Sequence, residues 1–186
     1  TYPLTDAFRL LGGVRYTRDE KDVKQSSALD FRPSGGVVLD RCILPSRVVS
    51  TPPIVSSSES WSEATWRGGA ELDLTSSTLL YGTVSRGYKA GGVTDFGVCG
   101  DYFDPERVLN YEVGVKGRFL DQALSLRLSA YQLKYEDLQV QRTLLIGTTT
   151  ENAASAKSQG IELEWALRGS ERLQLNGSVS SMDSEY

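Results

Sequence analysis

The chain has 186 residues, the length of one domain, and a formal net charge of -4 from 20 lysines and arginines against 24 aspartates and glutamates. This acidic balance argues against a nucleic-acid binder that neutralises phosphates, because such a protein needs a basic surface. Histidine is absent, and the two cysteines, Cys42 and Cys99, form no closely spaced pair. Histidine-based catalysis, histidine metal ligands and a structural zinc site are therefore excluded.

No stretch approaches the roughly 18 consecutive apolar residues of a membrane helix. No basic start followed by an apolar run marks a signal peptide. A membrane β-strand, however, shows only alternation of apolar and polar residues over about ten positions. A polar composition therefore leaves a membrane β-barrel open.

Alternation of apolar and polar residues is the dominant pattern along the chain. It predicts strands with one apolar and one polar face over residues 7–17, 66–74, 109–119, 161–167 and 173–179. Two further strands are less regular. Residues 79–89 are rich in β-formers but mixed, and residues 123–140 begin with clean alternation before Tyr131, Leu133 and Tyr135 fall on the polar face. Either a bulge or inward-facing tyrosines explains that change.

The connections between these strands alternate in length. Short connections lie at residues 75–78, 120–122 and 168–171, and long ones at residues 18–60, 90–105 and 141–156. Short and long connections at opposite ends of an up-and-down meander are the layout of an outer-membrane barrel. Charged residues and glycines in the middle of the polar faces suit a lumen, and the aromatic residues near strand ends resemble two interfacial girdles: Tyr16, Trp66, Phe119 and Trp165.

A soluble β-sandwich is the alternative, because one face of its sheets packs on a core and the other meets water. In that interpretation the aromatic residues near the strand ends are core residues.

Five segments resemble strand signatures of TonB-dependent outer-membrane receptors, in family order and with hairpin spacing. They are residues 12–21 (GGVRYTRDEK), 80–92 (LYGTVSRGYKAGG), 104–116 (DPERVLNYEVGVK), 130–139 (AYQLKYEDLQ) and 152–164 (NAASAKSQGIELE). The resemblance implies an all-β, antiparallel up-and-down transmembrane barrel of about 22 strands around a plug. The chain supplies about seven of those strands. We therefore expect residues 1–186 to be an internal fragment of the carboxy-terminal half, without the plug domain and the final strands.

The resemblance also implies a function in the bacterial outer membrane. It indicates active uptake of a scarce ligand, most often an iron–siderophore, driven by TonB through the absent plug segment. The expected partners are outer-membrane lipid, TonB and the small ligand, with no nucleic acid, no cofactor and no catalysis. The rival functions are a soluble β-sandwich binding module, a glycosidase and a plain porin.

Arg86, Tyr88 and Lys89 are the candidate ligand-binding residues. They lie near the predicted outer rim, where cationic and aromatic groups can meet an anionic iron chelate. The alternative is that the glycines of residues 86–92 let the strand leave the barrel while the cations face solvent or lipid headgroups. We favour this alternative, because the motif is a strand signature of a family whose members take up different ligands.

Two pairs of carboxylates share a strand face: Glu71 with Asp73, and Glu162 with Glu164. Such a pair can serve as the acid and the nucleophile of a glycosidase. The ordinary explanation is lumen-facing carboxylates paired with arginine or lysine on adjacent strands, and we favour it. No metal-binding cluster is expected. Cys42 and Cys99 fall in long loops on the same side, where an oxidising periplasm permits a disulfide, and two free thiols are the alternative.

Overall fold

The computed structural model describes residues 1–26, 38–39, 42–43, 54–93, 102–144, 147–152, 155–170 and 172–186. No helix within these residues is long and apolar enough to cross a membrane. The strands are β1 (Tyr2–Pro3), β2 (Phe8–Ser26), β3 (Val38–Leu39), β4 (Cys42–Ile43), β5 (Ile54–Thr75), β6 (Thr78–Lys89), β7 (Gly92–Val93), β8 (Tyr102–Phe103), β9 (Glu106–Phe119), β10 (Leu124–Glu136), β11 (Gln139–Leu144), β12 (Gly147–Asn152), β13 (Ala156–Ser170) and β14 (Leu173–Glu185).

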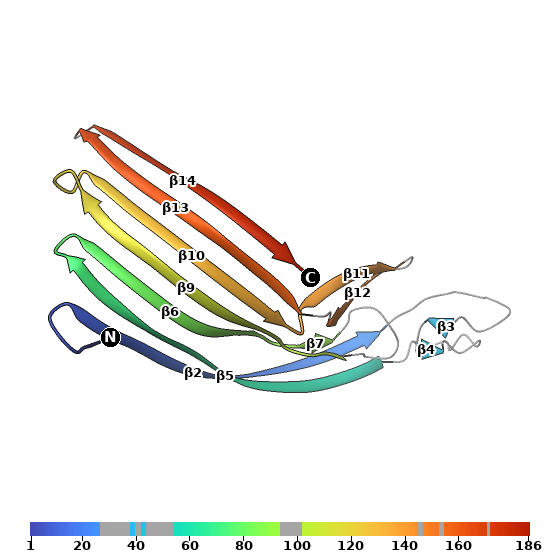
Figure 1. Ribbon diagram of the computed structural model, residues 1–186. Helices are drawn as coiled ribbons and strands as arrows, with labels where there is room; N and C mark the ends of the chain where they lie inside the picture. The colour runs from blue at the N-terminus through green and yellow to red at the C-terminus, as the bar shows by residue number, and fades with distance from the viewer. Residues whose placement is uncertain are drawn as a thin grey trace.

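Eight of these strands form one open antiparallel sheet in the order β1-β2-β5-β6-β9-β10-β13-β14. The seven long strands are those expected from the alternation, in the same order, and the all-β up-and-down meander is confirmed. Figure 1 shows a single curved layer with the tight turns at one end and the small hairpins β7–β8 and β11–β12 at the other. We call this second end the outer end.

The tight turns are held by local hydrogen bonds. Ser76 and Ser77 join β5 to β6, and the backbone N–H of Ser77 donates to Thr75 Oγ1 over 3.2 Å. Between β9 and β10, the N–H of Ala123 donates to the Leu120 carbonyl over 2.9 Å. Three consecutive residues of this second turn, Leu120, Asp121 and Gln122, have positive φ angles of 54°, 50° and 70°.

The two faces of the sheet differ in polarity, as the register shows. One row across β6, β9, β10, β13 and β14 contains Leu80, Val115, Leu128, Leu163 and Val179. The next row, on the opposite face, contains Tyr81, Gly114, Ser129, Glu162 and Ser180. A sandwich requires a second layer over the apolar face, yet the large apolar side chains of this face are exposed. In the described part of the chain, the buried hydrophobic residue is Tyr81, which lies on the polar face.

Tyrosines on the polar face lie over glycines of the neighbouring strand. Tyr81 pairs with Gly114, and Tyr131 pairs with Gly160. A Cβ atom on Gly114 would lie 2.6 Å from Tyr81 Cζ, and one on Gly160 would lie 2.8 Å from Tyr131 Oη. The register of β10 runs without a shift from Leu124 to Glu136. The tyrosines of β10 therefore face inward, and no bulge is needed to explain the change in its alternation.

Strands β2 and β5 are longer than the alternation predicted. Residues 18–60 were expected to be a loop, but β2 and β5 pair continuously from Phe8 opposite Leu72 to Ser26 opposite Ile54. The pair projects past the other long strands at the outer end (Figure 1). The expected loop is wrong for these residues because a ribbon with water on both faces needs no apolar alternation. Similarly, residues 141–156 contain most of the hairpin β11–β12.

Candidate functional site

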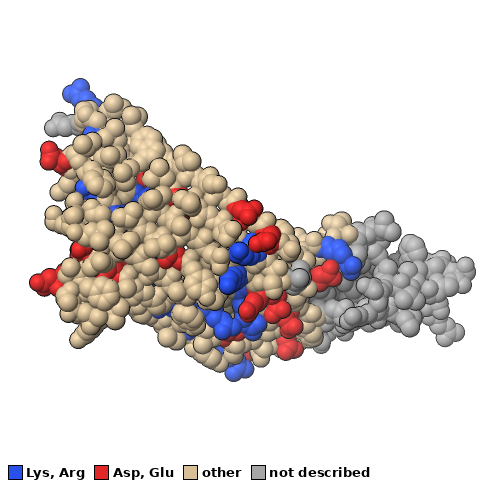
Figure 2. Space-filling model, viewed as in Figure 1, with Lys and Arg blue, Asp and Glu red and all other residues tan. Residues whose placement is uncertain are grey.

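A hollow of about 390 Å³ lies between the outer halves of β2, β5 and β6. Its lining residues are Arg15, Thr17, Asp19, Thr65, Arg86, Gly87, Tyr88 and Ala90. Charged side chains of both signs gather over this end of the strands (Figure 2). Two guanidinium groups, two threonine hydroxyls and one phenol therefore surround a single hollow that contains one carboxylate.

Glu63 on β5 holds two guanidinium groups beside this hollow. Its Oε2 lies 2.9 Å from Arg107 Nε, and its Oε1 lies 3.4 Å from Arg86 Nη2. Arg107 Nη1 also lies 3.6 Å from Asp137 Oδ2. The Glu63 side chain is only 14% exposed, so these ion pairs are better shielded from water than ordinary surface pairs. Sequence reasoning missed Glu63 because it precedes the alternating part of β5, in a serine-rich segment.

Tyr88 presents an unsatisfied polar atom. Its Oη is buried and makes no hydrogen bond of good geometry within the described residues, although the Asp19 carboxylate of the same hollow is close enough to interact with it, and Oδ1 of Asn110 on β9 is likewise buried without a well-formed bond. Burying a hydroxyl without a partner costs free energy, so unpaired groups of this kind are uncommon in folded proteins. Tyr88 lines the hollow, where a ligand oxygen can accept its hydrogen bond.

Of the three candidate ligand-binding residues, Arg86 and Tyr88 line the hollow together, whereas Lys89 is not among its lining residues. Lys89 Nζ lies 3.9 Å from Glu106 Oε2, and the lysine side chain is 63% exposed. From Val84 to Tyr88 every residue of β6 is half-buried, so the exposure of successive residues stops alternating after Thr83, while the register with β9 continues unshifted to Lys89. That change explains the mixed pattern of residues 79–89.

Two amide side chains tie the outer connections together. The Gln139 side chain donates to the Ala90 carbonyl over 3.0 Å. The Asn152 side chain donates to the carbonyls of Asp104 and Asp137 over 2.9 Å and 2.8 Å, and its own carbonyl oxygen accepts from the Asp104 N–H over 2.6 Å. The segments that follow β6, β8 and β10 are thereby held against hairpin β11–β12. This network fixes the rim beside the hollow.

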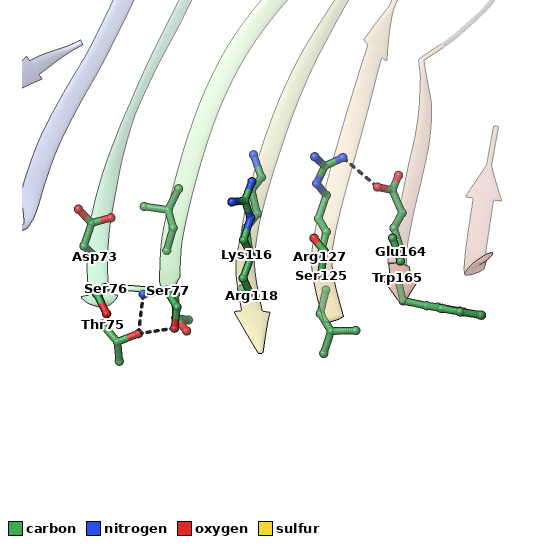
Figure 3. Close-up of a pocket in the computed structure, with 15 residues that line it drawn as sticks. Asp73, Thr75, Ser76, Ser77, Lys116, Arg118, Ser125, Arg127, Glu164 and Trp165 are labelled. Carbon is green, nitrogen blue, oxygen red and sulfur yellow. Dashed lines mark hydrogen bonds and ion pairs between the residues drawn. The ribbon is translucent and has the colours of Figure 1, made fainter. Parts of the chain in front are cut away.

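A second hollow, of about 490 Å³, lies at the tight-turn end of the polar face. Figure 3 shows Lys116, Arg118 and Arg127 on neighbouring strands there, with the Arg127 guanidinium turned toward Glu164. Arg127 Nη1 lies 2.8 Å from Glu164 Oε2. The side chains of both residues are about half exposed, so this ion pair contributes little stability by itself.

The contacts of the paired carboxylates fit lumen-facing side chains that pair with cations, rather than the acid and nucleophile of a glycosidase. Arg9 on β2 binds both members of one pair, with Nε 3.2 Å from Glu71 Oε2 and Nη2 2.8 Å from Asp73 Oδ1. Glu164 is bound by Arg127, and Glu162 lies between serines of the two adjacent strands. Three of the four carboxylates are thus ion-paired on the polar face, as expected for a lumen.

No group of three or more metal-ligating side chains occurs within the described ranges. Cys99 lies outside the described residues, and Cys42 is described only by its place in β4. The Cys42–Cys99 disulfide therefore stays a prediction. A two-dalton mass difference on reduction, together with protection from alkylation, is the expected evidence for it.

Comparisons with known proteins agree with the fold. The family model for the TonB dependent receptor-like β-barrel matches residues 1–186. The metal-pseudopaline receptor CntO of Pseudomonas aeruginosa is 33% identical over 130 residues, covering 70% of this chain and 18% of the receptor. The solved ferric yersiniabactin uptake receptor FyuA of Yersinia pestis is similar with a TM-score of 0.71 and 22% identity, covering 98% of this chain and 25% of that structure.

A third similar structure is the closed form of the ferric-catecholate import receptor Fiu of E. coli, with a TM-score of 0.70 and 18% identity over 97% of this chain and 26% of that structure. The chain thus spans about a quarter or less of the relatives it matches.

A single-layer curved sheet with an exposed apolar face excludes the sandwich, and the whole-chain match distinguishes the chain from a plain porin. The chain belongs to the β-barrel domain of the TonB-dependent receptor family, whose members are outer-membrane proteins of Gram-negative bacteria.

Proposed function

We propose that the receptor containing this chain imports a scarce metal as an anionic chelate, in the first instance an iron–siderophore complex, with energy delivered by TonB. The observation that carries this proposal is the hollow at the outer end, which presents Arg15 and Arg86 from two strands. Guanidinium groups bind the carboxylate and phenolate oxygens of chelators through charge-assisted hydrogen bonds. The hydroxyl of Tyr88, which makes no hydrogen bond of good geometry within the described residues, supplies a further donor.

The names of the relatives support the same ligand class. CntO, FyuA and Fiu are named as receptors for metal-pseudopaline, for ferric yersiniabactin and for a ferric catecholate. In each case the name gives a metal held by a small chelator, while the chelators differ. We therefore propose metal–chelate recognition as the function, with the chelator selected by the loops and by parts of the receptor beyond this chain.

Transport leaves the ligand covalently unchanged, so no catalytic group is required. The relatives are receptors rather than enzymes. We propose that this chain contributes barrel wall, lumen lining and part of the ligand entrance. TonB and outer-membrane lipid are its proposed partners, with TonB acting through a segment outside this chain.

The test uses the full-length receptor and a panel of radiolabelled ferric hydroxamate, catecholate and carboxylate siderophores. Uptake by cells lacking other receptors is expected for at least one member, and is expected to stop when TonB is deleted or the proton gradient collapses. Uptake that persists without TonB would indicate a passive porin and overturn the proposal.

The site itself is tested in the purified full-length receptor by titration with the ferric siderophore that the cells take up. Arg86→Gln and Arg15→Gln are each expected to weaken binding about tenfold or more, the effect of losing one charge-assisted hydrogen bond. Tyr88→Phe removes only the hydroxyl and is expected to weaken binding less than either. Lys89→Gln removes a cation of the same strand outside the hollow, and is expected to leave affinity unchanged. If all four variants bind the siderophore as tightly as the unmodified receptor does, the ligand does not bind in this hollow.

A further inference from the structure

The hollow at the outer end carries charges of opposite sign at two places along β2. The ladder between β2 and β5 places three pairs there on the polar face, from the inner side outward: Arg15–Thr65, Thr17–Glu63 and Asp19–Trp61. Arg15 and Asp19 both line the hollow. The register has no shift between these pairs, so the Cα atoms of the two residues lie about 14 Å apart at roughly 3.4 Å per residue. The hollow therefore presents a guanidinium at its inner end and a carboxylate at its outer end.

These two charges remain available to a ligand. Neither Arg15 nor Asp19 forms an ion pair with another residue that the structure describes. The Arg86 guanidinium of the same hollow is bound by Glu63, whose other oxygen binds Arg107. Both oxygens of Glu63 are thus taken by guanidinium groups. Asp19 is consequently the carboxylate of this hollow that a positively charged ligand group can reach.

The charged groups beside the hollow preserve this polarity. Arg67 lies on the same face one pair further inward than Arg15, so the inner end carries a second guanidinium. One pair beyond Asp19, Lys21 lies opposite Glu59, and their charges offset each other. The Lys21 ammonium also donates to the Gly91 carbonyl, so it has a partner of its own.

The charged side chains of β6 and β9 at this end are paired with one another. Lys89 Nζ lies 3.9 Å from Glu106 Oε2, and Arg107 Nη1 lies 3.6 Å from Asp137 Oδ2 in addition to its contact with Glu63. These pairs leave the difference between the two ends of β2 uncancelled.

The Tyr88 hydroxyl lies beside the Asp19 carboxylate. It is close enough to interact with that carboxylate, yet it is buried and makes no hydrogen bond of good geometry within the described residues. Asp19 is itself half-buried, and a carboxylate shielded from water is costly without a cation. A protonated amine has three N–H donors, and a phenol oxygen can accept as well as donate. One ammonium group therefore satisfies both side chains.

We propose that Asp19 is a specificity-determining residue of this hollow, and that it selects metal chelates carrying a protonated amine that does not coordinate the metal. This proposal rests on the proposed function, because it names the ligand class of the same site. The amine binds Asp19 and Tyr88 at the outer end, while an anionic group of the chelate meets Arg15 at the inner end. A chelate with negative charge on every side places an anion against Asp19, so this carboxylate also excludes wrong ligands.

The test uses the purified full-length receptor, titrated with ferric complexes prepared in pairs. The two members of a pair share a hydroxamate, catecholate or carboxylate core and differ only in a terminal amine, which is free in one and acetylated in the other. The unmodified receptor is expected to bind the free amine about tenfold more tightly, the effect of one charge-assisted hydrogen bond. Asp19→Asn removes the charge with little change of shape, and is expected to bind both members about equally.

Three further variants separate the two ends of the hollow. Arg15→Gln is expected to weaken binding of both members alike and to keep the preference for the amine. Tyr88→Phe removes one of the two acceptors, and is expected to reduce that preference by less than Asp19→Asn does. Asp22→Asn removes a carboxylate of the same strand from the opposite face, and as the matched control it is expected to change neither affinity nor preference.

The possible outcomes distinguish this proposal from the proposed function. Equal binding of both members by the unmodified receptor would overturn the role of Asp19 and leave metal–chelate recognition intact. A preference for the amine that survives in Asp19→Asn would also overturn it, because another residue would then bind the amine. If none of the cores binds in either form, this proposal and the proposed function both fail. Should Asp19→Asn not fold, the preference of the unmodified receptor and its reduction in Tyr88→Phe decide the question.

Discussion

The ring of Tyr81 lies over Gly114, its register partner on the adjacent strand, and its hydroxyl donates to Glu112 Oε1 over 2.7 Å. Lys116 Nζ lies 4.5 Å from the centroid of the same ring. One tyrosine thus joins a glutamate and a lysine of β9 on the polar face. The glycine supplies the room that this arrangement requires, because any side chain at residue 114 would occupy the place of the ring.

Gly114→Ala is therefore expected to destabilise the barrel wall. The new Cβ would lie 2.6 Å from Tyr81 Cζ, so the ring or the backbone must move, at a cost of about 1–3 kcal/mol. The measurement is the temperature at which the full-length receptor loses its heat-resistant band on an electrophoresis gel. Gly13→Ala is the matched control, since nothing lies within 4 Å of a Cβ at that glycine. If both variants unfold at the same temperature, the close packing at Gly114 is not a source of stability.

Glu63→Gln is expected to loosen the wall beside the outer hollow. It removes the carboxylate charge that Arg86 and Arg107 share, and charged hydrogen bonds of this kind contribute about 1.5–3 kcal/mol. A lower unfolding temperature and a weaker affinity for the metal chelate are both expected, because the Arg86 guanidinium loses the carboxylate that holds it in position. Glu151→Gln breaks an ion pair whose partners are both about half exposed, and less than about 1 kcal/mol is expected there. A Glu63 variant as stable as the Glu151 variant would contradict the assigned role.

Asn152→Ala is expected to release hairpin β11–β12 from the neighbouring connections. Its side chain makes three hydrogen bonds to the backbone of Asp104 and Asp137. Faster hydrogen exchange is expected at residues 102–106 and 137–152, with the centre of β10 unchanged. Thr148→Ala in the same hairpin is the control. Identical exchange in the two variants would show that the hairpin is held by other contacts.

Gln122→Gly is expected to stabilise the turn between β9 and β10. Gln122 has a φ of 70°, a left-handed conformation that costs an ordinary residue about 1 kcal/mol and glycine almost nothing. The unfolding temperature of the full-length receptor is expected to rise. Ser76→Gly in the turn between β5 and β6 is the comparison, because Ser76 is not among the residues with positive φ. A fall on changing Gln122 would mean that its side chain makes contacts that outweigh the strain.

The sequence predicted the strands wherever one face of the wall must be apolar. Val113 and Val115 alternate with Gly114 and Lys116 because lipid and lumen impose opposite demands on successive residues. The same reasoning could not find the outer half of β2 and the first half of β5. Beyond the membrane both faces of a ribbon meet water, and no alternation is imposed.

The candidate site was only partly predictable for a related reason. Arg86 and Tyr88 stand out as a cation and an aromatic residue near a predicted strand end, and they line one hollow. Glu63, Arg15 and Thr65 join them through pairing between strands that are far apart in the sequence, and a single sequence does not give that register. The inward position of Tyr131 on β10 needed the same information, because the glycine opposite it, Gly160, lies on β13.

The ladder between β2 and β5 makes that part of the wall taller than the membrane. Nineteen residues of β2 span about 63 Å, or roughly 48 Å in height at the usual tilt of about 40°, against an apolar band of about 25 Å. Pairing continues without interruption from Phe8 to Ser26, so the protruding part is a hydrogen-bonded two-stranded ribbon. A large particle approaching the cell surface would therefore meet this ribbon before it reached the hollow between β2, β5 and β6.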